Sequence, residues 1–462
     1  MGFSFGYGFK RRSYIFYRKG RNFFSTQWAG GAVLLFFVVI AMLLANLPLT
    51  AGFYHALLDA PVGITVGSFE FGFDLERFVN DGLMMVFFFT VGLEIKREVV
   101  SGHLSSFRKA ILPVAGALGG MVVPAAVYAL FNHGTEYAAG WGIPMATDIA
   151  FAIAILSTVG NRVPVSLKVF LTALAVVDDL GAIVVIAVFY GASVQFDLLL
   201  AAAVFLFLAW ILNRLKINSF LPYVLISVAL WFLFYHSGVH ATIAGVLLAM
   251  FIPSQPKYNK KYFLNKVRFF MDDFVSKDRG EDVPVTENEA QMRDLHRIEL
   301  IAADSASLSQ RFDHLLSPWV NYLILPLFAL INAGVPLTSA ADLDVFGTTQ
   351  GMGIVLGLWL GKPLGITLMS LLFVKTGLAT MPAGTTWKMF AAVACLGGIG
   401  FTMSIFIDTL AFASQPHFVS TGKIAVLAAS VAASVTGLVA VRAAHRAGGD
   451  ADAEAGDALP ER

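Results

Sequence analysis

The sequence predicts an all-α polytopic membrane protein, and two observations carry this prediction. Of the 462 residues, 57% are hydrophobic and only 14% are charged, whereas soluble domains carry roughly 25% charged residues. Long apolar runs also recur along nearly the whole chain. Because lipid offers no hydrogen bonds to the backbone, such runs must form helices or a closed barrel. A barrel strand would show an alternating segment of about ten residues, and the runs here are continuous and longer, which favours helices.

The apolar runs indicate about twelve transmembrane helices. We place them at residues 28–49, 79–100, 109–131, 143–159, 165–191, 197–213, 220–236, 239–252, 313–334, 350–374, 388–413 and 420–443. The first run follows a basic segment, as in a signal peptide. It is nevertheless about 20 residues long, enough to cross a bilayer, whereas the apolar part of a cleaved signal is usually about 7–15 residues. We therefore interpret it as the first helix.

Charges in the loops set the expected orientation of these helices. The N-terminus, the even-numbered loops and the start of the tail are basic, with Lys10, Arg11, Arg12, Arg18, Lys19, Arg21, Lys96, Arg97, Arg108, Lys109, Arg162, Arg214, Lys216, Lys375, Arg442 and Arg446. The odd-numbered loops are mostly acidic, with Asp59, Glu70, Asp74, Glu136, Asp197, Asp342 and Asp344; Arg77 and Lys423 are exceptions beside helix starts. Basic loops stay in the cytoplasm, so we expect both termini there.

Five segments follow from this reading. We expect a basic cytoplasmic N-terminus at 1–27, spans 1–8 at 28–252, a cytoplasmic polar insertion at 253–312, spans 9–12 at 313–443 and a disordered cytoplasmic tail at 444–462. In the insertion, "KYNKKYFLNKVRFF" mixes lysine with aromatic residues, which suits the anionic inner surface of a membrane. "KDRGEDVPVTEN" is typical of a flexible linker, and the helical spacing after it predicts a solvated amphipathic helix rather than a binding domain.

Four ionisable residues stand out within the apolar spans, namely Asp148, Asp178, Asp179 and Lys362. Each would cost roughly 2.5–3.5 kcal/mol at the centre of a bilayer, so such residues usually have a function. Neighbouring residues on a helix point about 100° apart, so Asp178 and Asp179 cannot face Lys362 equally. We expect one of the two to pair with Lys362 and the other to face a ligand that brings its own positive charge.

A small hard cation suits carboxylate ligands without sulfur or imidazole. A proton can take its place, because burial favours the neutral form of a carboxyl group. Cation and proton would then compete for one site, and a protein that opened this site alternately to each side would exchange them. In a different interpretation the charges only hold helices together, as in a membrane scaffold without transport, and a passive cation channel could also use the same acids.

Two spans are expected to be interrupted near these residues. Gly142 and Pro144 precede Asp148 in "GWGIPMATDIAF", and three glycines precede Thr402 in "CLGGIGFTMSIF". Each is the middle member of a three-span group, 109–191 or 350–443. This is the pattern of an inverted repeat with two broken, crossing helices, whose half-helix ends carry partial charges.

The sequence does not support a cysteine-cluster metal site, a nucleic-acid-binding site or a phosphate-binding loop. A single cysteine, Cys395, excludes a cysteine-cluster metal site, and a net charge of +1 gives no general attraction to nucleic acid. "GLWLGKP" is not a phosphate-binding loop, because only three residues separate Gly357 from Gly361 and Pro363 stands where Ser or Thr is required. The spacing of Gly353, Gly357 and Gly361 instead predicts close helix packing.

The chain resembles the NhaA family of bacterial sodium/proton antiporters over about 28–255 and 311–415. The resemblance is carried by "FVNDGLMMVFFFTVGLEIKREVVSGHL", "IPMATDIAFAIAIL", "AVVDDLGAIVVIAVFY", "SGVHATIAGVLLAMFIP", "LSPWVNYLILPLFALINAGV", "GKPLGI" and "GIGFTMSIF". It implies the inverted-repeat fold and a secondary transporter, not an enzyme, in the bacterial inner membrane. The implied activity is electrogenic exchange of cytoplasmic Na⁺ or Li⁺ for external H⁺, contributing to pH and sodium homeostasis. It also implies a homodimer in membrane lipid, with no cofactor and no nucleotide.

The resemblance also implies roles for individual residues. Cation and proton bind at Asp179, with Asp178 beside it as a second Na⁺ ligand and the partner of Lys362. Thr147 and Asp148 lie at the crossing of the broken helices, and Asp81 lies near the cation pathway. Regulation by pH is assigned to Glu94, Lys96, Arg97, Glu98, His240 and Asp313. The insertion at 254–312 is several tens of residues longer than in the best-known members and adjoins this regulatory region, so we expect it to affect the pH profile.

Overall fold

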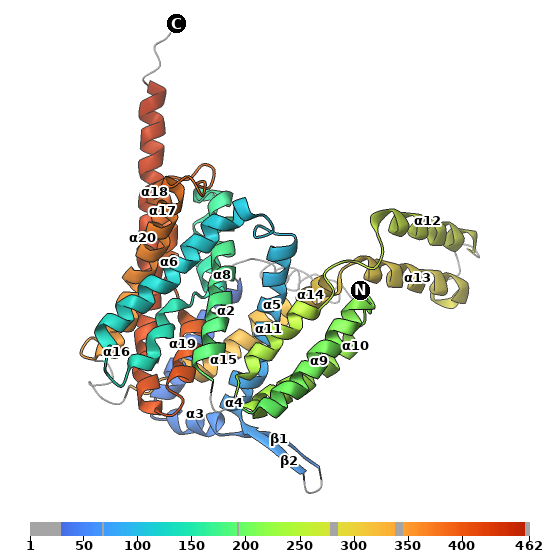
Figure 1. The fold of residues 1–462 in the computed structure, drawn as a ribbon. Helices are drawn as coiled ribbons and strands as arrows, with labels where there is room; N and C mark the ends of the chain where they lie inside the picture. Colours follow the sequence, from blue (N-terminus) through green and yellow to red (C-terminus); the bar gives the residue numbers. More distant parts are fainter. Residues whose placement is uncertain (1–28, 67–68, 192–193, 278–284, 338–344, 458–462) are drawn as a thin grey trace, which may run out of the picture. The chain divides into compact units, whose positions relative to one another are not determined.

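The computed structural model describes residues 29–66, 69–191, 194–277, 285–337 and 345–457, and the described chain is almost entirely helical (Figure 1). Its one sheet is the antiparallel hairpin β1 (Pro61–Val66) and β2 (Phe69–Asp74), in which Pro61 pairs with Asp74. The basic N-terminus expected at 1–27 and the acids expected at Asp342 and Asp344 lie outside the described residues.

The elements fall into two units along the chain. The first comprises residues 1–84, 98–191 and 320–462. Its helices are α2 (Ala29–Asn46), α3 (Ala51–Leu58), α4 (Leu75–Arg77), η1 (Phe78–Leu83), α6 (Phe107–Asn132), η2 (Ala138–Met145), α7 (Ile149–Thr158), η3 (Gly160–Arg162), α8 (Val165–Phe189), η5 (Val320–Ile324), α15 (Leu325–Asn332), α16 (Thr349–Leu356), η6 (Gly357–Gly361), α17 (Lys362–Lys375), α18 (Trp387–Leu396), α19 (Phe401–Ala411) and α20 (Pro416–Asp457).

The second unit comprises residues 85–97 and 192–319. It contains most of α5 (Met84–Val100), then α9 (Phe196–Arg214), α10 (Phe220–Ser237), α11 (Ala241–Phe251), α12 (Lys260–Ser276), η4 (Val285–Glu287), α13 (Glu289–Ser305) and α14 (Leu308–Trp319). Both units therefore hold apolar helices, as the composition predicts.

The number of membrane-spanning helices is close to the expected twelve, but twelve itself is not confirmed. Ten helical segments of the described chain are long and apolar enough to cross a membrane, and the bent pair α18–α19 would make eleven. The segment expected as a full span at 239–252 forms only α11, which has 11 residues and is about 16 Å long, against a hydrocarbon core of roughly 30 Å. Gly238, with φ +80°, ends α10 directly before it, and Pro253 follows it.

The ends of other expected segments also differ. Helix α20 continues past residue 443 to Asp457, into the tail that the sequence predicts to be disordered. The insertion holds two helices side by side, α12 and α13 (Figure 1). Of these, α13 matches the expected amphipathic helix, whereas α12 covers the lysine-rich aromatic stretch. Part of the expected linker, 278–284, lies outside the described residues.

Ion pairs hold this helical hairpin together. Lys277 at the end of α12 lies 2.6 Å from Asp273 and 2.8 Å from the fully buried Asp294 of α13. At the base of the hairpin, Lys257 lies 3.1 Å from Asp304, and its backbone N–H donates to the Asp304 carbonyl at 3.0 Å. Residues 257 and 304 are therefore already adjacent, and the hairpin is a closed side branch of the chain.

Glycines let the helices of the first unit approach closely, which places the buried charges. A Cβ on Gly119 of α6 would lie 2.1 Å from the carbonyl oxygen of Gly365 in α17. On the next face, a Cβ on Gly357 would lie 2.8 Å from the Cβ of Pro144 in η2. Such small-residue contacts are typical of helices packed in lipid, and here they bring α17 against α6 and η6 against η2, with Lys362 where η6 and α17 meet.

Candidate functional site

The two expected helix breaks lie against each other in the first unit. Residues 146–148 separate η2 from α7, and residues 397–400 separate α18 from α19, which bend by 50°. The Asp148 N–H donates to the Ile399 carbonyl at 2.7 Å, and the Thr147 hydroxyl donates to the Gly397 carbonyl at 2.9 Å. The breaks therefore satisfy each other's backbone groups, as the prediction of crossing broken helices requires.

Asp148 ties the two half-helices together. As the N-cap of α7, it accepts a hydrogen bond from the Phe151 N–H at 3.0 Å. Its other oxygen accepts from the Thr402 N–H at 3.2 Å and the Thr402 hydroxyl at 2.6 Å, in the first turn of α19. The carboxylate, in a residue only 3% exposed, thus lies at the positive ends of two helices, where a negative charge is favoured.

The structure resolves which aspartate bonds to Lys362. The Lys362 ammonium donates to Asp178 Oδ2 at 2.6 Å and also to the Met145 carbonyl, and both side chains are fully buried. The Thr147 hydroxyl lies 2.6 Å from the same Asp178 oxygen, so its single hydrogen is shared between this acceptor and the Gly397 carbonyl. Asp179, on the next position of α8, is 3% exposed and interacts electrostatically with Lys362. Four of the predicted residues are thus gathered at the crossing, with Asp179 beside them.

The helix that carries Lys362 is itself irregular. Residues Gly357–Gly361 form the π-helical turn η6, and Lys362 begins α17 directly after it, followed by Pro363. π-helical turns are frequent at functional sites. The turn directs the lysine towards the break between η2 and α7, where the Met145 carbonyl receives it.

A cavity of about 330 Å³ lies in the same unit between α7 and α8. Its lining includes Glu98, His103, Lys168 and Thr172. On α8 the lining residues 165, 168, 169 and 172 follow one helical face, and Asp179 lies two turns, about 10 Å, further along that face. Of the residues expected to regulate by pH, Glu98 is the one that lines this cavity.

Three other expected regulatory residues contact one another in the second unit. Arg97 lies 3.1 Å from Asp313 of α14 and 3.9 Å from Glu94. The Ser317 hydroxyl donates to the second Asp313 oxygen at 2.8 Å, so the serine stands where it can support this carboxylate. Arg97, Glu94 and Asp313 form what we call the α5–α14 ion cluster.

Lys96 and His240 have different positions. The Lys96 ammonium donates to the carbonyls of Met250 (2.6 Å) and Ile252 at the end of α11, where a positive charge is favoured. His240 precedes the first residue of α11, so these two residues lie at opposite ends of the same helix, about 16 Å long. The structure thus does not bring His240 to the end of α11 that Lys96 binds.

Asp81 lies in the π-helical turn η1 and is partly buried. The neighbouring Asn80 donates to and accepts from the Asn332 side chain, at 3.3 and 2.7 Å. The turn η1 is thereby attached to α15.

One buried acid of the apolar helices was not anticipated from the sequence. Asp408 in α19 is fully buried, although it lies in the apolar run "GFTMSIFIDTLAF" and meets the same criterion that identified Asp148. It was not among the residues predicted for the site, although it falls within the span expected at 388–413. The break at 397–400 makes α19 a separate half-helix packed on α20 and η2.

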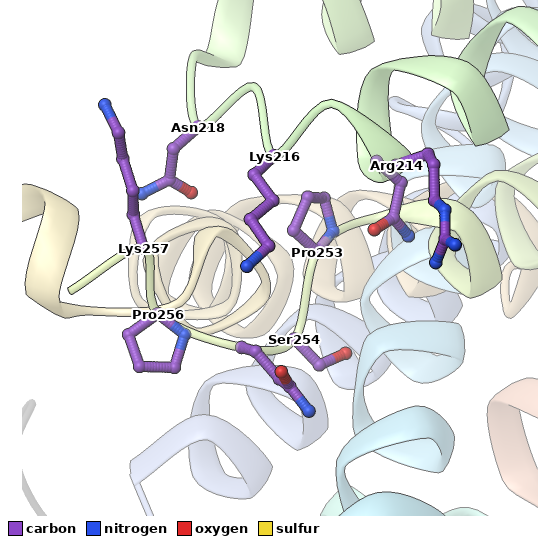
Figure 2. Close-up of a pocket in the computed structure, with 9 residues that line it drawn as sticks. Arg214, Lys216, Asn218, Pro253, Ser254, Pro256 and Lys257 are labelled. Carbon is purple, nitrogen blue, oxygen red and sulfur yellow. The ribbon is translucent and has the colours of Figure 1, made fainter. Parts of the chain in front are cut away.

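A basic cavity of about 190 Å³ occupies the second unit (Figure 2). Arg214 and Lys216 from the turn after α9 and Lys257 from the start of the insertion surround it, and Figure 2 shows the Lys216 side chain pointing between the two loops. The basic residues of these two loops therefore lie at one end of their helices.

Comparison with known proteins agrees with this arrangement. The family model described as Na⁺/H⁺ antiporter 1 matches residues 21–441. A protein named Na⁺/H⁺ antiporter NhaA from Oleidesulfovibrio alaskensis is 44% identical over 422 residues, covering 91% of this chain and 93% of the relative. Proteins of the same name from Wolinella succinogenes and Escherichia coli O9:H4 are 43% and 41% identical, covering 90% of this chain and 91% and 96% of their own lengths.

Proposed function

Since this chain belongs to the Na⁺/H⁺ antiporter 1 family, we propose that it exchanges Na⁺ or Li⁺ for H⁺ across the bacterial inner membrane. The observation that carries the proposal is the buried group at the helix crossing, in which Lys362 bonds to Asp178 and Asp179 stands beside them. It provides carboxylate oxygens for a hard cation away from bulk water, as competition between Na⁺ and H⁺ requires.

Binding of the cation changes the hydrogen bonds of this group. Asp178 Oδ2 already accepts from Lys362 and from Thr147. A Na⁺ ion held by both Asp178 and Asp179 repels the Lys362 ammonium and weakens its bond to Asp178. Return of a proton to the carboxylates releases the cation and restores the bond. The three ionisable groups thus titrate as a set, and electrogenic exchange follows when the protons that they return carry more charge than the cation released.

The paired breaks provide the moving part. Transporters with inverted repeats alternate access by shifting broken helices around a fixed site near the bilayer midplane. Here the bonds of Thr147 to Gly397 and of Asp148 to Thr402 join α7 to α19, so the two half-helices move together. Their movement opens the carboxylates first to one side and then to the other, without a continuous pore.

The proposal also covers the regulation of exchange by pH and the orientation of the chain in the membrane. We assign regulation to the α5–α14 ion cluster and to Glu98 at the cavity beside α8. We place both termini in the cytoplasm, because the basic loops after α9 and α11 line one cavity (Figure 2), as expected when both face the same side. Cytoplasmic Na⁺ then leaves in exchange for external H⁺. A dimer in membrane lipid, without a cofactor, is the expected form.

One experiment separates exchange from the two alternatives. In everted vesicles that maintain a pH gradient, added Na⁺ collapses the gradient if the protein is an exchanger, and Asp179→Asn abolishes this response. A passive channel instead conducts Na⁺ according to voltage without moving protons, and a scaffold gives no response. Either of these results would reject the proposed function.

A further inference from the structure

Another fully buried carboxylate, Asp408, lies on a half-helix of the crossing, away from the Asp178–Asp179 group. Asp408 follows Thr402 by six residues on α19, about 9 Å along the helix, and is 0% exposed. Within the part of the chain that the structure describes, neither of its carboxylate oxygens has a hydrogen-bond partner. Asp178 is equally buried but accepts from Lys362 and Thr147, so burial alone does not explain how Asp408 is accommodated.

The carboxyl group lies against the backbone of α20. A Cβ on Gly422 would lie 2.1 Å from Asp408 Oδ1 and 2.4 Å from Oδ2, so only glycine leaves room for the acid there. The next residue, Lys423, is partly buried and interacts with Asp408 electrostatically. Among the described residues, no ion pair within 4.0 Å joins the two. The nearest base therefore lies close to the acid but is not in contact with it.

The other ionisable groups around Asp408 interact with partners other than its carboxylate. Tyr128 of α6 and Tyr190, directly after α8, are near enough to influence Asp408 electrostatically, but their hydroxyls donate to the carbonyls of Tyr137 and Ala139, each at 2.8 Å. Glu76 acts on Lys423 rather than on Asp408. Two further elements packed on α19, η2 and α15, contain no ionisable side chain.

An ionised carboxylate without any donor is far more costly to bury than the neutral acid. We infer that Asp408 is a second proton-binding site of this protein, neutral in the arrangement seen here and ionised when Lys423 comes into contact with it. In that step the Asp408 O–H bond breaks, the proton passes to water, and the resulting carboxylate pairs with the Lys423 ammonium. The site requires no other reactant.

The position of Asp408 couples this proton to the moving helices. Thr402, in the first turn of the same helix, bonds to Asp148, and the Ser404 hydroxyl donates to the Ile143 carbonyl of η2 at 2.8 Å. A shift of α19 against α20 changes the separation of Asp408 and Lys423. Coupling to transport rests on the proposed function, whereas the proton site itself does not.

Infrared spectroscopy of the full chain tests the site directly. The protein is reconstituted in phosphatidylethanolamine–phosphatidylglycerol vesicles, and pH-difference spectra are recorded without Na⁺. We expect a carboxylic-acid C=O band that is lost in Asp408→Asn and retained in Asp179→Asn and Asp408→Glu. Because this readout needs no transport, it remains valid even if the chain proves not to exchange Na⁺ for H⁺.

A second variant, Lys423→Gln, tests the site even if Asp408→Asn does not fold. Lys423→Gln removes the countercharge of the ionised acid, so the same band should persist to higher pH by about 1 unit or more, the usual effect of one nearby opposite charge. In vesicles, Asp408→Asn should also reduce the dependence of Na⁺-driven H⁺ flux on the pH of the proton-supplying side. The inference is overturned if folded Asp408→Asn shows every carboxylic-acid band of the wild type. It is also overturned if the band in Lys423→Gln disappears at the same pH as in the wild type.

Discussion

Lys362 donates a hydrogen bond to Asp178 at 2.6 Å, although Asp179 occupies the next position of the same helix. The pair is completely buried, so removal of one partner leaves an uncompensated charge. We therefore predict that Asp178→Asn destabilises the protein by about 3–5 kcal/mol, the usual cost of breaking a buried ion pair. Thermal unfolding of the purified protein in detergent measures this loss.

A matched double variant tests whether the uncompensated charge causes this loss of stability. Asp178→Asn combined with Lys362→Met removes both charges, so much of the lost stability should return. Asp179→Asn, which leaves the hydrogen bond of Lys362 to Asp178 in place, should unfold closer to the wild type while losing exchange. Equal destabilisation by Asp178→Asn and Asp179→Asn would contradict the assignment of Asp178 as the bonded partner.

Thr402 offers a second prediction, because its hydroxyl donates to the buried Asp148 carboxylate at 2.6 Å. Thr402→Val keeps the shape of the side chain but removes this donor, at a cost of about 1.5–3 kcal/mol for a hydrogen bond to a charged group. Thr409→Val on the same helix is the control, since its hydroxyl donates only to the Phe406 carbonyl. Exchange and stability should both fall more in Thr402→Val. A similar loss of exchange and stability in the two variants would contradict a special role for the contact between Thr402 and Asp148.

The α5–α14 ion cluster leads to a prediction about regulation. Arg97 is 47% exposed, so its pair with Asp313 should contribute no more than about 1 kcal/mol to stability. Asp313→Asn and Arg97→Gln should nevertheless each move the pH of half-maximal exchange, by the same amount and in the same direction, because each breaks the same contact. The double variant should move it no further. Additive shifts in vesicle assays would show that the two residues act separately.

The insertion hairpin should influence the pH profile without being needed for exchange. Deletion of 258–306 removes α12 and α13. The chain can be rejoined because the bonds of Lys257 to Asp304 and of Ser309 to Pro253 keep the two new ends, residues 257 and 307, near each other. The deletion shortens the connection between α11 and α14, so it changes the constraint on α14, which carries Asp313. We expect Na⁺/H⁺ exchange to persist with a shifted pH of half-maximal activity, measured by fluorescence dequenching in everted vesicles. An unchanged pH profile would rule out this role.

Titration of the hairpin's own lysines should not cause that shift. The hydrogen bond to Asp304 raises the pKa of Lys257, and bonds to Asp273 and Asp294 raise the pKa of Lys277. A raised lysine pKa gives stability that is fully present below the unfolded value of about 10.4 and is lost only as the pH rises above it. Lys257→Gln should therefore have the same effect on exchange at every pH near neutrality.

Much of the site could be predicted from the sequence, because charged residues in long apolar runs are few. Asp148, Asp178, Asp179 and Lys362 were identified on that ground, and glycine and proline marked both breaks. The choice of Asp178 over Asp179 as the partner of Lys362 depends on how α8 is rotated, which the residues alone leave open. The resemblance implies Asp178, and in the structure the Lys362 ammonium bonds to that residue.

Other features depend on contacts between distant segments. The segment 239–252 is mostly apolar, yet only α11 forms, because Gly238 and Pro253 limit the helix. Asp408 was missed because its burial results from the close approach of Gly422, which lies on the following helix. The hairpin of α12 and α13 depends on Lys277 reaching Asp294, a pairing across part of a stretch that reads as a flexible linker.

Calorimetric titration of the purified protein with Na⁺ or Li⁺ tests the central claim most directly. Repeating the titration at several pH values, in buffers with different heats of ionisation, gives both the affinity and the protons released. If H⁺ and Na⁺ compete for the buried aspartates, binding weakens as the pH falls, protons leave as the cation binds, and Asp179→Asn abolishes both effects. Cation binding with the same affinity at every pH and no proton release would contradict the account.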